Sequence, residues 1–341
     1  MRRRFAPAAK LATALAAGLL VVAGCGEKQE RAGPVAPQPF TLVLDFFPNA
    51  DHAPIYAAQS NGRFRELGLD VTIRAPSDPS APIAQAAAGR SDLAISYEPQ
   101  VYRARDQGSR VVSVGALVQR PLTSIISLTQ ARIRAPSDLR GKRVGTAGID
   151  YQAAFLRTIL TRAGVDPASV RVQDVGFNLN QALLNRRVDA TLGAFYNYEG
   201  TQLKLERRNP QIIPVDRVGV PAYDELVFVA GEGRLDEPGE QGKVRRFLEA
   251  VERGRRDLER DRERGLRGLL QANPDLDARL QRAALDATLP LFAPPRGKPF
   301  GWQEPREWEH FAAWMRDNGL VRSPTAARGA FTNDLLPGRG L

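Results

Sequence analysis

The sequence predicts an α/β fold whose strands run mostly parallel. Runs of β-branched and apolar residues alternate with short helical stretches, which is the pattern of βαβ units. In the first part of the chain we expect strands at 40–44, 69–74, 93–96 and 111–118, separated by helices at 54–61, 80–88 and 99–106. With 341 residues, of which 43% are apolar and 25% charged, the chain is long enough for two lobes of one fold.

The N-terminus has the pattern of an export signal. Four basic residues among the first ten precede an apolar run over residues 11–22. That run is too short to span a bilayer but suits the core of a signal peptide. We expect residues 1–24 to form this segment, and its removal takes four positive charges from the net +10, leaving +6.

Cys25 directly follows the apolar run and is the only cysteine of the chain. The segment Val22-Ala23-Gly24-Cys25 resembles a bacterial lipobox, in which cleavage before the cysteine leaves a lipidated N-terminus. An ordinary secretory signal with an incidental thiol is the alternative. Residues 25–39 are polar and contain three prolines, so we expect a flexible, lipid-anchored tether.

The composition argues against several kinds of site. A single cysteine leaves no disulfide and no thiolate metal site, and two histidines make another metal site unexpected. No Walker or Gly-x-Gly-x-x-Gly motif occurs, and no cofactor is predicted. Because the basic residues are interleaved with glutamates on predicted helices, nucleic acid is not an expected partner.

Polar and aromatic side chains follow the first predicted strand, where the chain passes into a helix. Asp45, Phe46, Asn49 and His52 lie in this junction, and such junctions are where open α/β sheets hold ligands. The alternative is a capped helix, with Asn49 or Asp51 as N-cap, the phenylalanines in the core and His52 a satisfied surface imidazole.

Tyr97 and Glu98 follow the strand at 93–96 and should reach the same sheet edge. Here too, capping is an alternative, since Glu98 would lie in the first turn of a helix, where its charge is favoured.

The second half of the chain continues the alternation of strands and helices. A strand that ends near residue 146 precedes a helix at 151–163, and Gly148 to Asp150 should present backbone N–H groups to the cleft. A strand at 170–175 and a helix at 178–185 follow. Further along, we expect a return strand at 218–220 and 223–230, amphipathic helices at 243–259 and 276–289, and core packing for Trp308, Phe311 and Met315.

Three aromatic residues, Phe195, Tyr196 and Tyr198, occur within four positions and adjoin Glu199. Their rings can sandwich a flat ligand, and Glu199 can accept a hydrogen bond from an exocyclic amine. An aromatic core with Glu199 on a solvated helix is the alternative.

Three segments resemble the thiamine-pyrimidine family, which joins substrate-binding proteins of bacterial ABC importers to fungal thiamine-pyrimidine synthases. They are the opening signature at 44–59, the crossover at 119–126, where Gln119, Pro121, Leu122 and Thr123 match the family pattern, and the loop at 197–199. For the crossover residues, a hinge strand without ligand contact is the alternative. The resemblance covers residues 40–336. It implies a two-lobed periplasmic-binding-protein-like fold of type II with a hinge, one lobe formed by 40–125 plus 226–336 and the other by 126–225.

The family includes both receptors and enzymes, and the expected export with a lipid anchor suits a receptor rather than an enzyme that needs a cytosolic cofactor. The fungal relatives use pyridoxal phosphate and a sacrificed histidine and are associated with a cysteine-rich motif, which this chain lacks. We therefore expect a monomeric, lipid-anchored receptor that delivers a thiamine pyrimidine precursor, of the formylaminopyrimidine or hydroxymethylpyrimidine type, to an ABC permease. The candidate ligand-binding residues are Asp45, Phe46, Asn49, His52, Tyr97, Glu98, Gln119, Tyr196, Tyr198 and Glu199.

Other functions stay open on the sequence. A receptor for riboflavin or another heterocycle is one alternative, and a synthase-like enzyme is a weaker one. A sulfonate or taurine receptor is disfavoured, since Asp45, Glu98 and Glu199 would repel an anion.

Overall fold

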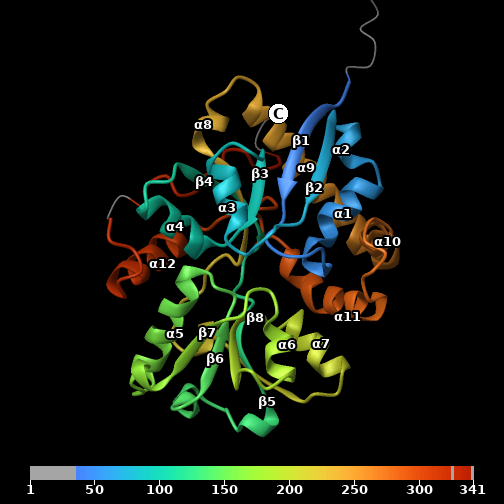
Figure 1. The fold of residues 1–341 in the computed structure, drawn as a ribbon. Coiled ribbons are helices and arrows are strands. Elements are labelled where there is room, and N and C mark those ends of the chain that lie inside the picture. The colour runs from blue at the N-terminus through green and yellow to red at the C-terminus, as the bar shows by residue number, and fades with distance from the viewer. Residues whose placement is uncertain (1–35, 324–325, 339–341) are drawn as a thin grey trace, which may run out of the picture. The chain divides into compact units, whose positions relative to one another are not determined.

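Two five-stranded sheets organise the chain, which a computed structural model describes over residues 36–323 and 326–338. We call them the sheets of lobe 1 and lobe 2. In Figure 1 the sheet of lobe 1 lies in the upper half of the picture and that of lobe 2 in the lower half. The strands of lobe 1 are β1 (Gln38–Val43), β2 (Leu69–Arg74), β3 (Leu93–Ser96), β4 (Val111–Val118) and β10 (Leu226–Gly231). Those of lobe 2 are β5 (Thr123–Leu128), β6 (Arg143–Thr146), β7 (Arg171–Asp174), β8 (Ala190–Phe195) and β9 (Pro210–Pro214).

Both sheets have the same topology. In lobe 1 the order is β2-β1-β3-β10-β4, with β1 parallel to β2 and β3, and β10 antiparallel to both its neighbours. In lobe 2 the order is β7-β6-β8-β5-β9, with β6 parallel to β7 and β8, and β5 antiparallel to β8 and β9. In each sheet the antiparallel strand inside the sheet is the one that arrives from the other lobe. The prediction of two mostly parallel α/β lobes joined by two crossovers is therefore confirmed.

Helices cover the sheets. Lobe 1 carries α1 (Ala53–Ser60), α2 (Arg63–Glu66), α3 (Ala81–Ala87), α4 (Glu98–Asp106), α8 (Glu232–Leu235), α9 (Glu240–Arg260), α10 (Arg262–Ala272), α11 (Ala278–Thr288) and α12 (Pro305–Asp317). Lobe 2 carries α5 (Asp150–Arg162), α6 (Leu179–Leu184) and α7 (Glu199–Leu205). Short 3₁₀ turns are η1 (Ala50–His52), η2 (Thr129–Ala131), η3 (Pro136–Leu139), η4 (Pro167–Ser169), η5 (Val215–Arg217) and η6 (Leu289–Phe292).

Two glycines let helix α1 pack at backbone distance against α9 and α10. A Cβ atom on Gly254 of α9 would collide with the Pro54 carbonyl oxygen and lie 2.7 Å from the Ala58 nitrogen. A Cβ atom on Gly268 of α10 would lie 2.7 Å from the Tyr56 carbonyl oxygen. Because real Cβ atoms do not approach backbone atoms so closely, only glycine fits at these two positions. Helix α1, and the turn that precedes it, is thus held by residues about 200 positions further along the chain.

The structure differs from the sequence prediction in three places. Val218 to Val220 belong to no strand, and the return strand begins at Leu226 rather than Tyr223. Strand β9 was not predicted, because its two terminal prolines are typical of a loop. It exists as an edge strand, paired on one side only, where a missing N–H can be tolerated.

The predicted boundary between the lobes at residues 125 and 126 falls inside β5, which belongs as a whole to the second sheet. The lobe boundaries stay a prediction. Trp308, Phe311 and Met315 of α12 are buried, as the helical spacing predicts. The predicted signal peptide, Cys25 and most of the tether lie outside the described residues. Among the described helices, none combines the length and the hydrophobicity needed to cross a bilayer.

Candidate functional site

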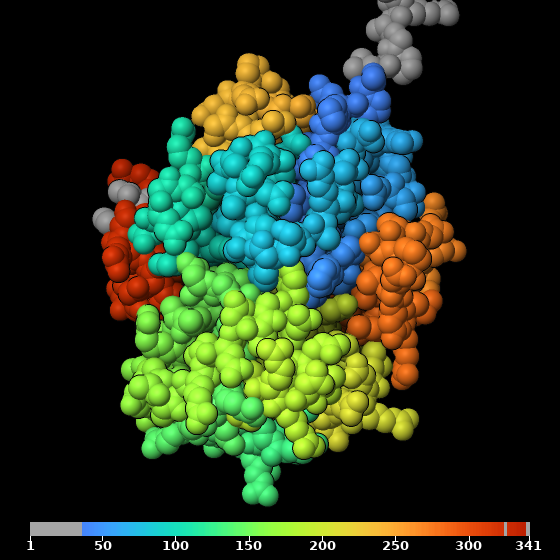
Figure 2. All heavy atoms as spheres, viewed as in Figure 1, coloured from blue at the N-terminus to red at the C-terminus, as the bar shows by residue number. Residues whose placement is uncertain are grey.

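A cavity lies between the carboxyl edges of the two sheets. On the face seen in Figure 2, green to yellow atoms of lobe 2 lie directly against blue and teal atoms of lobe 1. The cavity has a volume of about 30 Å³ for the centres of water molecules, which is room for about two waters. Its lining residues are Asp45, Phe46, Asn49, Asp51, Pro79, Tyr97, Ala147, Ile149, Tyr151, Gln152, Phe177, Leu179, Gly193, Phe195, Tyr198 and Glu199.

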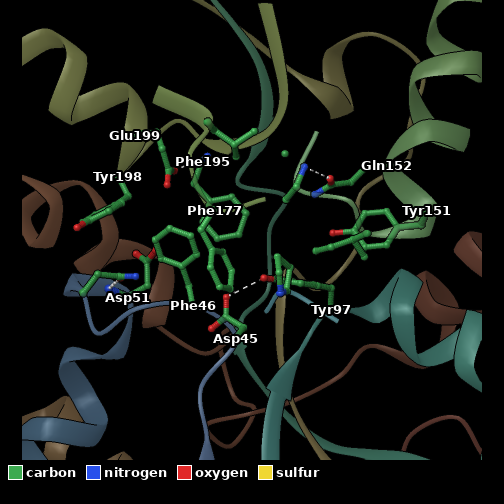
Figure 3. Close-up of a pocket in the computed structure, with 16 residues that line it drawn as sticks. Asp45, Phe46, Asp51, Tyr97, Tyr151, Gln152, Phe177, Phe195, Tyr198 and Glu199 are labelled. Atoms are coloured by element: carbon green, nitrogen blue, oxygen red, sulfur yellow. Dashed lines mark hydrogen bonds between the residues drawn. The ribbon is translucent and has the colours of Figure 1, made fainter. Parts of the chain in front are cut away.

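Aromatic rings from both lobes form two walls of the cavity (Figure 3). On one side, Phe46 of lobe 1 lies edge-on to Phe177 of lobe 2, with ring centroids 4.8 Å apart. On the other, Tyr97 of lobe 1 lies edge-on to Tyr151 at 6.1 Å and to Phe195 at 6.4 Å, both in lobe 2. These edge-to-face pairs are favourable contacts that exist only while the lobes are together. A flat ligand between the walls would replace ring-to-ring contacts with contacts to its own faces.

Asp45 is held in place by two donors. The backbone N–H of Asn49 donates to His52 Nδ1 at 3.2 Å, so the ring proton lies on Nε2. Nε2 in turn donates to Asp45 Oδ1 at 2.9 Å, and the Tyr97 hydroxyl donates to Asp45 Oδ2 at 2.9 Å. Both carboxylate oxygens of Asp45 therefore have partners before any ligand binds.

Asp51 has a free oxygen in the cavity wall. The Asn49 side chain caps η1 by accepting from the Asp51 N–H at 2.7 Å, which turns Asp51 inward. Oδ1 accepts from Asn197 and Thr288, whereas Oδ2 is buried and has no hydrogen-bond partner. Burial raises the pKa of Asp51 from 3.8 to about 6, although the hydrogen bonds from Thr288 and Asn197 lower it.

Glu199 is the third carboxylate of the cavity. It begins α7, and its Oε2 accepts from the Phe195 backbone N–H at 2.8 Å. Burial raises its pKa from 4.5 to about 7, against the lowering effect of this hydrogen bond. The three carboxylates share the cavity with amides and aromatic rings, and none of the described residues that line it is a Lys, Arg or His. Such a site favours a neutral or cationic ligand that carries N–H donors over an anion.

The structure brings six of the ten predicted site residues to the cavity: Asp45, Phe46, Asn49, Tyr97, Tyr198 and Glu199. The other four are elsewhere. His52 is fully buried behind Asp45 rather than at the surface, and Tyr196 is half-buried outside the lining. Glu98 accepts from the Asp224 backbone N–H at 2.7 Å, and Gln119 donates to the Trp302 carbonyl oxygen.

Ten of the sixteen lining residues were missing from the predicted site, and four of these ten bear a polar group or an aromatic ring for which no ligand contact was expected: Asp51, Tyr151, Gln152 and Phe177. Asp51 was considered only as a helix cap, although its position two residues after Asn49 was a usable signal. Tyr151 and Gln152 belong to the first turn of α5, directly after the Gly148 to Asp150 segment that was expected to present backbone N–H groups to the cleft. Phe177 follows β7 at the same sheet edge as the other strand ends, and this position was its only signal in the sequence.

The sequence profile of the family described as NMT1/THI5 like matches residues 49–262. The chain belongs to the NMT1/THI5-like family. This confirms the resemblance to the thiamine-pyrimidine family.

Relatives of the NMT1/THI5-like chain include a binding protein and a synthase. It is 36% identical over 297 residues to the formylaminopyrimidine-binding protein of Halalkalibacterium halodurans, and the matched residues cover 86% of this chain and 89% of the relative. It is 26% identical over 300 residues to the 4-amino-5-hydroxymethyl-2-methylpyrimidine phosphate synthase of Legionella pneumophila, with 87% and 92% of the two chains covered.

Solved structures place the NMT1/THI5-like chain in the periplasmic-binding-protein fold. The alkanesulfonate-binding protein SsuA of Xanthomonas axonopodis superposes with a TM-score of 0.68 over 87% of this chain and 99% of its own, at 16% identity. The type II fold that the sequence predicts is thereby confirmed.

Proposed function

We propose that this protein is an extracytoplasmic solute-binding protein that captures an aminopyrimidine precursor of thiamine between its two lobes. The observation that carries the proposal is the cavity itself, in which aromatic walls enclose three carboxylates and, over residues 36–323 and 326–338, no cationic side chain is part of the lining. An aminopyrimidine offers flat faces to the rings and N–H donors to the carboxylates. The 36% identity to a formylaminopyrimidine-binding protein supports the same ligand class.

Closure of the lobes is part of the proposal. A cavity with room for about two waters cannot admit a substituted pyrimidine ring unless the lobes separate or the rings rotate. The lobes are joined by two crossovers, 119–122 and 218–225, and a hinge at these segments would open the cleft. Ligand contacts to both lobes would then favour the closed form.

The cellular setting follows from the N-terminal pattern. We propose that cleavage before Cys25 leaves a lipid-anchored protein with a tether over residues 25–39, which delivers its ligand as a monomer to an ABC permease. Membrane partitioning of the native protein, and its loss in Cys25→Ser, would test the anchor. A native protein that is soluble and still carries Met1 or Arg2 would contradict it.

A synthase is the second candidate, because relatives at 23–26% identity carry that name. The positions of the two histidines count against it. His52 is buried with both ring nitrogens bonded, and His310 lies exposed on α12. Neither imidazole is among the residues that line the cavity.

Mass spectrometry of the small molecule that copurifies with the protein tests the ligand class. We expect an aminopyrimidine, and a flavin or a sulfonate would overturn the proposal.

Calorimetric titration with 4-amino-5-hydroxymethyl-2-methylpyrimidine then tests the site. Glu199→Gln keeps the shape of the side chain but removes its charge and one acceptor, so affinity should fall on the order of tenfold to a hundredfold. Glu206→Gln is the matched control, since Glu206 lies exposed at the other end of α7. Equal affinity in wild type and Glu199→Gln would remove Glu199 from the site.

A further inference from the structure

Three buried side chains link the two lobes beside the cavity. Asn197 belongs to lobe 2, between β8 and α7, whereas Asp51 of η1 and Thr288 of α11 belong to lobe 1. Asn197 Nδ2 donates to Asp51 Oδ1 at 2.6 Å and to Thr288 Oγ1 at 2.7 Å. The Thr288 hydroxyl lies 2.9 Å from both Asp51 Oδ1 and the Ala284 carbonyl oxygen. All three side chains are buried, so the network is shielded from competing water.

Two oxygens of the network have no hydrogen-bond partner, Asp51 Oδ2 and Asn197 Oδ1, and of these two residues only Asp51 lines the cavity. Asp51 Oδ2 is buried without a partner and lies in the cavity wall, where Figure 3 shows the Asp51 carboxyl near the Phe46 and Tyr198 side chains. A buried carboxylate oxygen without a donor is unfavourable. The lining side chains that border it include no cation, so the missing donor is one that the cavity's occupant can bring.

We propose that Asp51 binds the ligand and couples it to closure: its Oδ2 accepts an N–H from the ligand, while its Oδ1 holds Asn197 of the opposite lobe. This inference rests on the proposed function and adds the residue that links binding to the movement of the lobes. In the open form water can solvate both oxygens of Asp51. Closure removes that water, and Asn197 then serves Oδ1 while the ligand serves Oδ2. A ligand with an amino or amidinium group therefore favours the closed form, whereas one without N–H donors leaves Oδ2 unpaired.

Four variants separate the two halves of the coupling. Asp51→Asn keeps an oxygen for Asn197 but places an NH₂ group where the ligand would donate. Asn197→Ala removes the bond between the lobes and leaves the cavity oxygen in place. Thr288→Val removes the hydroxyl that supports Asn197. Thr158→Val is the matched control, because the Thr158 hydroxyl also bonds the carbonyl four residues earlier, at 3.1 Å, but within helix α5 of lobe 2.

The experiment titrates each variant with 4-amino-5-hydroxymethyl-2-methylpyrimidine and records small-angle X-ray scattering with and without it. We expect Asn197→Ala and Thr288→Val to lose fivefold to 150-fold in affinity, the usual range of coupling between sites. Their scattering should also show less compaction on saturation than wild type. Asp51→Asn should lose at least as much affinity, and Thr158→Val should match wild type in both measurements. Thermal melting of each variant checks that it is folded.

Two failures can be told apart. If wild type binds the probe, but Asn197→Ala and Thr288→Val match it in affinity and compaction, the coupling through Asn197 is refuted and the proposed function stands. If Asp51→Asn also binds as wild type does, Asp51 is not a ligand-binding residue. If folded wild type binds no aminopyrimidine, the proposed function fails and the coupling fails with it.

Discussion

Glu225 ties the two crossovers together, so its removal should destabilise the protein strongly. It directly precedes β10 on the return crossover, and its Oε2 accepts from the backbone N–H groups of Leu122 and Thr123 at 2.7 and 2.8 Å. Its Oε1 accepts from the Thr123 hydroxyl at 3.0 Å, and the Tyr223 hydroxyl donates to Oε2 at 3.0 Å. The side chain is fully buried, and burial raises its pKa to about 7.

Glu225→Ala leaves two buried backbone N–H groups without an acceptor. Each such group costs about 1–3 kcal/mol, so we expect the free energy of unfolding to fall by about 2–6 kcal/mol. Glu225→Gln should behave differently, because its amide oxygen can accept from both N–H groups while the Thr123 hydroxyl turns to accept from the NH₂. Since a raised pKa means that burial disfavours the charged form, the neutral amide should cost less than about 1 kcal/mol at pH 8.

Urea unfolding followed by tryptophan fluorescence at pH 8 measures both variants. Glu206→Ala, an exposed glutamate at the end of α7, controls for the substitution itself. If the free energy of unfolding of Glu225→Ala lies within 1 kcal/mol of the wild-type value, the role of Glu225 in joining the two crossovers is refuted. Equal destabilisation by alanine and glutamine would show that the charge, not the acceptor geometry, matters.

Three further outcomes are expected. Burial raises the pKa of several carboxyls, so the folded protein holds their protons to higher pH than the unfolded chain does. The stability that these groups contribute should be full below pH 4 and fall as the pH rises toward 7, which thermal melting without ligand measures. A melting temperature at pH 8 that equals or exceeds the one at pH 5 would contradict this. These carboxyls are Asp51, Glu199, Asp224 and Glu225. Asp150→Asn breaks the half-exposed ion pair with Arg103 across the lobes, at 2.8 Å, and should weaken ligand affinity less than tenfold by calorimetry, because such pairs contribute about 0–1 kcal/mol. Gly148→Ala should lower the melting temperature, since Gly148 has φ +76° and its added Cβ would collide with the Asp174 carboxylate; an unchanged melting temperature would show that the turn relaxes.

Much of the fold could be predicted, because the spacing of apolar residues and the residues that form turns are properties of short stretches of sequence. Strands β2, β3 and β4 begin and end where the alternation of apolar residues predicts. The mostly parallel order follows from helices between consecutive strands. The exception, β9, depends on pairing with β5, a contact between residues about 85 positions apart that no local pattern reveals.

Within the site, the sequence could predict which residues follow strand ends at one sheet edge, but not which residues meet across the cleft. Asp45 and Tyr97 follow β1 and β3 in the same lobe, and their meeting follows from parallel strands that share an edge. The same logic led to Glu98, which is not among the lining residues and whose carboxylate accepts from the Asp224 backbone N–H on the return crossover. The partners across the cleft, Phe177 beside Phe46 among them, depend on how the two lobes meet, which the order of elements along the chain does not specify.

The glycine contacts of α1 imply an order of folding that reverses the order of synthesis. All strands of lobe 2 come from one continuous segment, β5 to β9, so this lobe has its complete sheet once residue 214 has been made. Lobe 1 can be completed only when later residues have been made, because β10 lies inside its sheet and α1 packs against Gly254 and Gly268. Chains usually fold from the N-terminal domain onward. Here the turn at Asp45 to Asp51, which lines the cavity, is among the last parts to be fixed. A chain that stops before Gly268 has the full sheet of lobe 2 but lacks part of the packing that holds this turn.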